Sequence, residues 1–282
     1  MIVLTADDYA LTEGVSRAIG ELAAARRLSA TSVLVTTPHW PVTAPRLAAH
    51  RSKICVGLHL DFTLGSPLGA MPRLAPNGRF PARNAFIARA LLGLLDPAEL
   101  RAEIERQLNA FETRLGFPPD HIDGHEHVHV LSGVRQALIE VVGRRYRGVT
   151  PLLRDPSDRS SAIRARGGPV AKAVGVSALA LGFARAARRH ALPTNQGFSG
   201  FSRYDVGEPY AEELASALIE PGSRHILMCH PGHRDAGDRA DDPIAARRPM
   251  EYEALMQDAS VPERIWRPSR AADGPPVDWL SV

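Results

Sequence analysis

The sequence of 282 residues predicts a parallel α/β fold, and within that class a TIM-like β/α barrel. Short apolar runs that are typical of strands alternate with longer helical patterns, which is the order that parallel sheets require. Polar residues capable of chemistry follow four of the predicted strands. Since barrel strands end at one rim, where active sites lie, this placement favours a barrel over an open sheet. The residues are Asp7, Asp8, His59, His125 and His230.

The individual elements follow from the periodicity of apolar residues. Strands are expected at Ile2–Thr5, Thr31–Val35, Ile54–Leu60, Asp120–Gly124, 151–154 and His225–Cys229. Helices are expected at Thr12–Arg27, 83–115, 133–145, 170–190, Pro209–Ile219 and Pro243–Met256. Thr12 can cap the first helix, and Asp96-Pro97 divides 83–115 into two helices, with Asp96 capping the second. Residues 1–282 form one domain, in which 262–282 are expected to be an irregular, proline-rich tail.

Composition excludes several classes of protein. The net charge of +3 is too small to predict a nucleic acid partner. The chain shows no leader pattern and no apolar run of ~18 residues, so neither a signal peptide nor a transmembrane helix is expected. Cys55 and Cys229 lie in apolar runs. They are expected to be buried free thiols in a reducing compartment, which predicts a cytoplasmic protein.

The most informative segment is His121–His129, in which His or Asp occupies every second position. Alternate strand residues share a face, so a continuous strand would place four imidazoles and a carboxylate together. Burying such a row without a partner is costly, and a divalent metal is the expected partner. Residues two apart on a strand are separated by about 6.6 Å, so one ion can take only one or two of them.

Other residues must therefore complete the site. Gly124 suggests a bend that would aim His125 at the rim, and Asp123 could accept a hydrogen bond from a ligand imidazole. His121 lies deepest and is the least suitable ligand, while His127 and His129 have no assigned role. The Phe62–Arg83 loop is rich in proline and glycine and could form part of a substrate cleft.

The paired acids Asp7-Asp8 could supply one metal ligand and one free general base. Alternatively, both are solvated loop acids that cap the next helix. His59 lies in the apolar run Val56–Leu60, where a core histidine bonded to the backbone is the alternative. His230 precedes Pro-Gly and could protonate a leaving group or stabilise developing charge, or it could be a turn residue without a role.

Four motifs together resemble the YdjC-like carbohydrate deacetylases, a family that includes chitooligosaccharide deacetylases and hopanoid-associated deacetylases. The resemblance covers residues 5 to 235, with the motifs in the same order. The paired acids and the histidine row are the specific motifs, and the other two support them. The motifs read Ala6-Asp7-Asp8-Tyr9, Gly57-Leu58-His59, His121-x-Asp123-x-His125-x-His127 and Cys229-His230-Pro231-Gly232.

This resemblance implies a distorted β/α barrel with one divalent metal ion, expected to be magnesium, with zinc or another divalent ion as the alternative. It implies hydrolysis of the acetamido group of an amino sugar, in a free oligosaccharide or a glycolipid. Carried over by position, the metal ligands are Asp8, His59 and His125. Asp7 is then the general base, and His230 is the acid or the partner of the oxyanion.

Two positions depart from the family pattern. Ala10 replaces a common glycine, so the turn after the paired acids is expected to lack a positive φ. In Thr194-Asn195-Gln196-Gly197, Gln196 stands where aspartate is common, which bears on specificity if that position touches substrate.

Two other functions remain open from the sequence: a metal-dependent phosphoesterase on a β/α barrel, and a sugar-binding or metal-binding protein without catalysis. Residues 144–191 are rich in arginine, and the helix expected at 170–190 could rest on an anionic membrane. An ordinary outer barrel helix with a charged face is favoured over that contact. The sequence leaves a homo-oligomer open.

Overall fold

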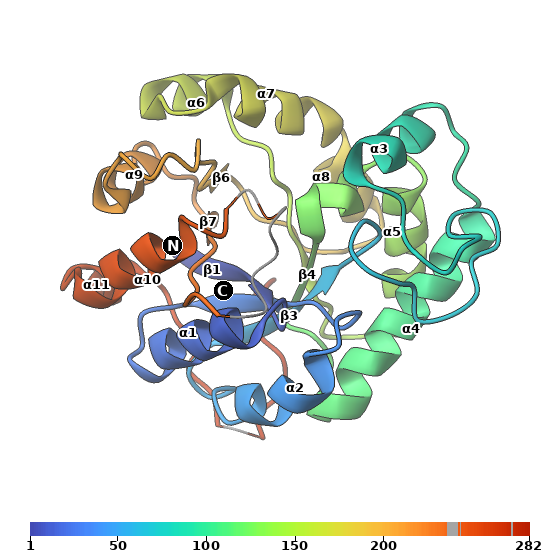
Figure 1. Ribbon diagram of the computed structural model, residues 1–282, viewed down its shortest axis with the longest axis horizontal. Helices are drawn as coiled ribbons and strands as arrows, with labels where there is room; N and C mark the ends of the chain where they lie inside the picture. The colour runs from blue at the N-terminus through green and yellow to red at the C-terminus, as the bar shows by residue number, and fades with distance from the viewer. Residues whose placement is uncertain (236–241, 243, 272) are drawn as a thin grey trace.

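Seven parallel strands form the centre of the protein in the computed structural model, which describes residues 1–235, 242, 244–271 and 273–282 (Figure 1). The strand order is β5-β4-β3-β2-β1-β7-β6. A bridge between Leu153 and Thr194 joins β5 to the segment that enters β6, so the curled sheet closes into a distorted barrel. The barrel prediction is confirmed. The strands are β1 (Ile2–Tyr9), β2 (Ala30–Val33), β3 (Cys55–Leu60), β4 (His121–Gly124), β5 (Leu152–Leu153), β6 (Phe198–Ser199) and β7 (His225–Cys229).

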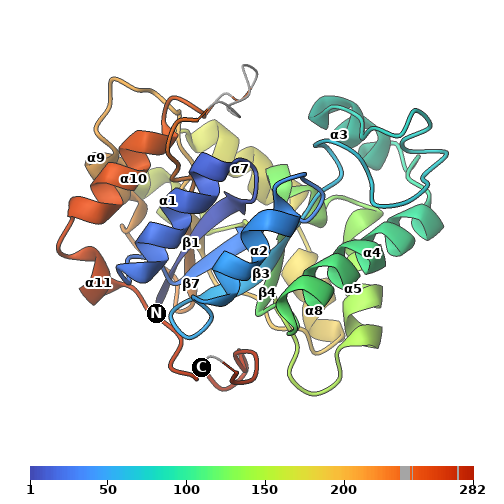
Figure 2. The ribbon, with the colours of Figure 1, turned by 60° about the horizontal axis from the view of Figure 1, so that its bottom comes forward.

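Helices surround the strands, and Figure 2 shows α1 and α2 lying over β1 and β3. The helices before β5 are α1 (Glu13–Ala24), α2 (Trp40–Ala48), α3 (Arg83–Leu91), α4 (Pro97–Leu115) and α5 (Val134–Arg145). Those after β5 are α6 (Ser160–Arg166), α7 (Val170–Leu179), α8 (Phe183–Arg189), α9 (Tyr210–Ala217), α10 (Arg248–Gln257) and α11 (Val261–Arg264). Pro243, the expected start of the last long helix, lies outside the described residues.

Both predicted helix caps are present. The Thr12 hydroxyl accepts a hydrogen bond from the Val15 backbone N–H at 3.1 Å. The Asp96 carboxylate accepts from the N–H groups of Ala98 and Glu99, at 2.8 and 3.2 Å. These bonds satisfy backbone N–H donors that have no partner within the helix. In both α1 and α4, a short polar residue before an apolar periodic run therefore correctly predicts where the helix begins.

The prediction of a single helix at 170–190 is wrong, because the structure has two helices there, α7 and α8. Gly182 has φ +81°, and the chain turns there between α7 and α8. By length and composition alone, Val170–Arg189 could cross a membrane, contrary to the sequence expectation, and with only 22% of its most apolar window buried it is not a core helix. Because α7 has ten residues and is about 15 Å long, it cannot span a hydrocarbon core of about 30 Å.

The tail is irregular, as expected, but it has a structural role. The Trp266 N–H donates to the Ile2 carbonyl at 2.8 Å, and the Trp279 indole N–H donates to the Asp120 carbonyl at 2.5 Å. Arg270 forms an ion pair with Asp120 at 2.5 Å. Since Ile2 opens β1 and Asp120 immediately precedes β4, the tail covers the amino end of the barrel. Cys55, one of two buried free cysteines, packs in the same cluster as Trp279.

Candidate active site

A distortion of β1 brings both paired acids to one side. In a regular strand, Asp7 and Asp8 would face opposite ways. Here Asp8 has φ +69°, and the pairing with β2 shifts register between Ala6 and Tyr9. Aspartate tolerates the left-handed region better than most residues. The bulge thus allows both buried carboxylates to line the same cleft.

The backbone after the paired acids also departs from the sequence expectation. Ala10 has φ +72°, so the prediction that it would exclude a positive φ is wrong. The Ala10 N–H donates to Ser16 at 3.1 Å, and its carbonyl accepts from Thr37 at 2.5 Å. These contacts hold a conformation that costs a non-glycine residue roughly 1–2 kcal/mol.

Three predicted ligands meet at the rim. Nε2 of His59, on β3, lies 3.5 Å from Oδ1 of Asp8. Nδ1 of His125, immediately after β4, lies 3.1 Å from the same oxygen. The three ligand atoms all lie within 4.8 Å of one another. The structure therefore places together the side chains proposed to share an ion, although they come from three different strands.

The segment His121–His129 does not form one continuous strand, so its alternating side chains do not share a face. β4 ends at Gly124, and the chain then forms a short 3-10 segment, η1 (His125–Val130). Glu126 and His127 have φ +53° and +60°, so the bend follows His125 rather than preceding it. Gly124 itself is extended, but a Cβ there would lie 2.9 Å from the His129 ring. The glycine is thus required by a close contact.

The other histidines of this segment are separated by the turn. The His127 ring contacts Phe198 and Phe201 edge-on, with centroids 5.6 Å apart in each case. The ring of His129 is buried and bonds to the Arg154 carbonyl at 2.7 Å. His121 lies deep, with Nε2 3.0 Å from the Ser32 hydroxyl, and is not a ligand of the group above.

Asp123 accepts a hydrogen bond from a predicted ligand imidazole, as expected from the sequence. Its Oδ1 accepts from Nδ1 of His59 at 2.6 Å, which leaves Nε2 of that ring facing Asp8. Ser32 donates to the other oxygen at 2.6 Å. Burial would raise the pKa of Asp123, but Arg154 and His59 hold it below its ordinary value. The carboxylate therefore stays ionised and fixes the orientation of the His59 ring.

Asp7 forms an ion pair that the sequence analysis did not predict. Both of its oxygens accept from Nη1 of Arg154, at 2.8 and 2.9 Å, and the arginine also lies 3.0 Å from Asp123. Arg154 follows β5 and is fully buried. A carboxylate has about four lone-pair positions, so Asp7 retains capacity to accept a proton. Arg154 was missed, although a polar residue directly after Leu152-Leu153 is the same strand-end signal.

Arg248, at the start of α10, was also missed. Its guanidinium donates to Oδ2 of Asp8 at 2.7 Å and to Asp242 at 3.1 Å. Burial would raise the pKa of Asp8, but Arg248 and the imidazoles hold it well below its ordinary value. Because Arg248 takes Oδ2, Oδ1 is the oxygen that faces His59 and His125.

His230 lies at the end of β7, on the cleft wall. Its backbone N–H donates to the Glu251 carboxylate at 2.5 Å, and its ring meets Tyr204 edge-on at 6.0 Å. Burial lowers the pKa of His230 to about 4. The ring is therefore neutral near pH 7 and can donate one N–H hydrogen bond, which suits a partner of a developing negative charge.

Comparison with known proteins identifies the family of this chain. Residues 1–261 match the model of the family described as YdjC-like protein. The chain belongs to the YdjC-like family. A carbohydrate deacetylase of Mus musculus is 32% identical over 261 residues, which cover 82% of this chain and 78% of that protein. A chitooligosaccharide deacetylase of Serratia marcescens is 34% identical over 244 residues, covering 84% of this chain and 83% of that protein.

Two further matches differ in extent. The carbohydrate deacetylase of Homo sapiens is 35% identical over 146 residues, so the match spans 50% of this YdjC-like chain and 45% of that protein. A solved structure from Enterococcus faecalis V583, named as a candidate for cellobiose-phosphate cleavage, has a TM-score of 0.66 at 20% identity. It covers 93% of this chain and 92% of that one, and it supports the fold.

The cleft of this YdjC-like protein has a volume of about 480 Å³. Its lining includes all the predicted site residues, here called the Asp-His constellation: Asp7, Asp8, His59, His125 and His230. Arg83 and Ile87 of α3 line one side, and Val176 and Leu179 of α7 also contribute. Both ends of the Phe62–Arg83 loop reach the cleft, as predicted. Gln196, in contrast, accepts from the Ser223 hydroxyl near the amino end of β7, away from the rim.

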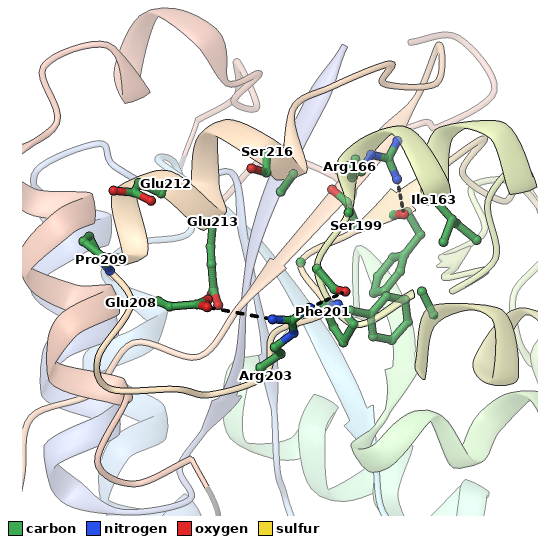
Figure 3. Close-up of a pocket in the computed structure, with 17 residues that line it drawn as sticks. Ile163, Arg166, Ser199, Phe201, Arg203, Glu208, Pro209, Glu212, Glu213 and Ser216 are labelled. Carbon is green, nitrogen blue, oxygen red and sulfur yellow. Dashed lines mark hydrogen bonds and ion pairs between the residues drawn. The ribbon is translucent and has the colours of Figure 1, made fainter. Parts of the chain in front are cut away.

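A second pocket of about 320 Å³ lies between α6, α7 and α9 (Figure 3). Figure 3 shows Arg203 and Glu208 facing one another, with their charged groups 3.9 Å apart. Phe198 and Phe201 line this pocket and also contact His127, which lines the cleft. The pocket is therefore a neighbour of the cleft, but its lining does not include the Asp-His constellation.

Proposed function

We propose that this protein is a metal-dependent hydrolase that removes the acetyl group from an N-acetylated amino sugar. One observation carries the proposal: Asp8, His59 and His125 converge, and the carboxylate of Asp7 lines the same cleft. Relatives named carbohydrate deacetylase and chitooligosaccharide deacetylase support the reaction class. An N-acetylated amino sugar is the matching substrate.

The spacing of the donors suits one divalent ion. Ligand atoms each about 2.1 Å from an ion lie about 3.0 Å apart at a right angle and about 3.4 Å apart at the tetrahedral angle. The distances from Oδ1 of Asp8, 3.1 Å to His125 and 3.5 Å to His59, are close to these values. Two imidazoles and a carboxylate suit magnesium, zinc, manganese or cobalt. Magnesium is the ion we propose, on the family resemblance.

The charge around His59 also favours a cation. Burial would lower the pKa of His59, but the carboxylates of Asp123 and Asp7 outweigh it and raise that pKa to about 10. Burial likewise opposes protonation of His125, yet its bond to Asp8 raises the pKa. The group of side chains is thus short of positive charge, which a divalent ion would supply.

The chain's own residues define the chemistry. A bound divalent ion would polarise the acetyl carbonyl and increase the acidity of water. Asp7 accepts the proton from the attacking water, while Arg154 holds its carboxylate in place. The neutral His230 ring donates a hydrogen bond to developing charge, and the proton that Asp7 has taken from water passes to the leaving amine. Buried Asp123 keeps the His59 ring oriented throughout.

A metal-dependent phosphoesterase is the rival enzyme. Such enzymes commonly use two metal ions about 3.5–4 Å apart. A second set of donors, Asp7, His59 and Asp123, does lie close together. However, Arg154 contacts both of these carboxylates, at 2.8 and 3.0 Å, and supplies the positive charge there. This arrangement favours one ion, and so favours the deacetylase over the phosphoesterase.

The test is an acetate-release assay on N-acetylglucosamine oligomers and lipid-linked glucosaminyl compounds, with the metal varied. We expect acetate release that a chelator stops and a divalent ion restores. Asp7→Asn should abolish turnover and retain bound metal. Phosphate release from phosphoesters without acetate release would establish the rival. Metal or sugar binding without turnover of any substrate would indicate the non-catalytic function.

A further inference from the structure

The outward face of α7 is apolar rather than charged. Ala171, Val174, Gly175 and Ala178 are exposed and lie three or four residues apart, which places them on one face of the helix. Val174 is 46% exposed, and Leu181 in the turn after α7 is 80% exposed. The charged face expected for 170–190 therefore falls on α8, where Arg185, Arg188 and Arg189 are exposed, and not on this side of α7.

The opposite face of the same segment is packed on the protein. Ala173, Ala180, Phe183 and Ala187 are buried, and the Phe183 ring contacts that of His129 edge-on at 5.6 Å. The α7–α8 segment is thus fixed on the barrel with an apolar surface outward. This is the arrangement of a helix that lies in an interface plane rather than one that crosses a membrane.

The charge of this region identifies the partner. Residues 159–204 contain no Asp or Glu and have eight Arg or Lys residues. Six of these arginines are exposed, and two of them, Arg188 and Arg189, follow Arg185 by three and four residues on one side of α8. The exposed six are Arg159, Arg164, Arg185, Arg188, Arg189 and Arg203. Cations beside an exposed apolar surface are complementary to anionic headgroups above a hydrocarbon layer.

A second copy of the chain is the competing occupant of this surface. In a symmetric dimer through α7–α8, the exposed arginines of one copy would approach those of the other. Like charges in such an arrangement repel. The same cations attract an anionic bilayer, so the distribution of charge favours lipid over self-association.

The exposed apolar surface of α7 lies beside the cleft, so a membrane bound there would be close to the site. Val176 and Leu179 of α7 line the cleft, and α3 contributes Arg83 and Ile87 to the same lining. The end of α3 and the loop that follows expose Leu91, Leu92 and Leu94 by 65%, 72% and 66%. Figure 1 shows α3 close to one end of α7. Helices with exposed apolar residues therefore stand beside the cleft.

We propose that the α7–α8 segment docks the protein on an anionic lipid surface, with Leu181 and Val174 in the apolar layer and Arg188 and Arg189 among the headgroups. The proposal does not depend on the reaction catalysed, because it concerns a surface outside the Asp-His constellation. The cleft would then open beside the bilayer.

The test is co-sedimentation of the full chain with vesicles of equal parts phosphatidylcholine and phosphatidylglycerol. We expect binding that weakens with added salt and is much weaker for phosphatidylcholine alone. Arg188→Gln with Arg189→Gln should reduce the partition coefficient about 30-fold, from about 1 kcal/mol per cation. Leu181→Asp should also reduce binding. The matched controls are Val42→Asp, at a residue 66% exposed on α2, and Arg114→Gln at an exposed residue of α4.

Turnover of a soluble substrate and the unfolding temperature should be unchanged in every variant, which separates docking from folding and from catalysis. Absence of binding to the mixed vesicles at low salt would overturn the proposal. Equal loss of binding in the control variants would overturn it too. A dimer that Leu181→Asp dissociates, without vesicle binding, would show that a second copy covers the surface.

Discussion

Replacing Asp123 by Asn tests the central arrangement, because it keeps the shape of the side chain and removes its charge. The Asp123 carboxylate lies 2.6 Å from Nδ1 of His59 and is fully buried. Its charge favours a proton on His59, but it favours a divalent ion more, because the ion carries twice the charge. Loss of such a partner typically weakens metal binding 10–100-fold, or about 1.4–2.7 kcal/mol. We expect a loss of that size for Asp123→Asn.

The assay is equilibrium titration of the metal-free protein with magnesium, manganese and zinc, together with acetate release at saturating metal. Ser32→Ala is the matched control, because it removes the 2.6 Å hydrogen bond to the other oxygen of Asp123 and leaves the charge in place. It should change metal affinity by less than about fivefold, or about 1 kcal/mol, because the lost hydrogen bond is to the carboxylate and not to the His59 ring or the ion. If Asp123→Asn folds normally and binds metal as tightly as the natural chain, His59 is not a ligand oriented by Asp123.

Further predictions follow from other contacts. Arg154→Met leaves Asp7 and Asp123 buried without their cation and should lower the free energy of unfolding by about 3–5 kcal/mol in urea titrations; a change below 1 kcal/mol would contradict the ion-pair role. Because the pKa of His59 is raised to about 10, its protonation stabilises the metal-free protein most below the unfolded value near 6.5, and this contribution is lost as pH rises toward 10. Metal binding displaces that proton, so metal affinity should rise with pH between the two values, and a flat profile would exclude His59 as the site of displacement. Ala10→Gly relieves the strain of a φ of +72° and should stabilise the protein by about 1 kcal/mol, measured as a raised unfolding temperature. An unchanged or lower unfolding temperature would show that the turn is not strained. Trp279→Ala should destabilise it by about 3–5 kcal/mol in the same urea assay, and a neutral result would mean that the tail does not complete the core.

The barrel, and the convergence of Asp8, His59 and His125 at its rim, could be predicted because their signals are local. Each of the three residues lies at or near the end of a short apolar run, and parallel strands bring such ends to one rim. The order of strands need not be known for this inference. A polar residue in or after a buried strand is therefore informative even in a single sequence.

The partners of the two arginines could not be predicted in the same way. Arg154 is 147 residues from Asp7, and Arg248 is 240 residues from Asp8. Arg154 directly follows a strand, so its place at the rim was open to prediction, but its pairing with Asp7 was not. Arg248 lies in Ala-Arg-Arg-Pro beside Arg247, which is also buried and binds backbone carbonyls instead. Which guanidinium reaches which carboxylate depends on how distant segments pack.

Backbone turns account for the other differences. Positive φ at Asp8, Ala10, Glu126 and His127 is unfavourable for each residue taken alone, so propensity predicts extended strand there. The surrounding hydrogen bonds and packing impose these conformations. They separate the histidines of His121–His129 and bring Asp7 and Asp8 together, so the strained residues lie where the chemistry is expected. The cytoplasmic location and the oligomeric state stay predictions.

The tail that covers the amino end of the barrel has a consequence for how this chain is made. Contacts of Trp266 with Ile2, and of Trp279 with Asp120, join residues synthesised late to the first strands. The floor of the barrel can therefore close only after residues 266–279 have been synthesised. Until then the nascent chain exposes the cluster around Val3, Cys55 and Ile226, and such exposed apolar surface is prone to aggregation.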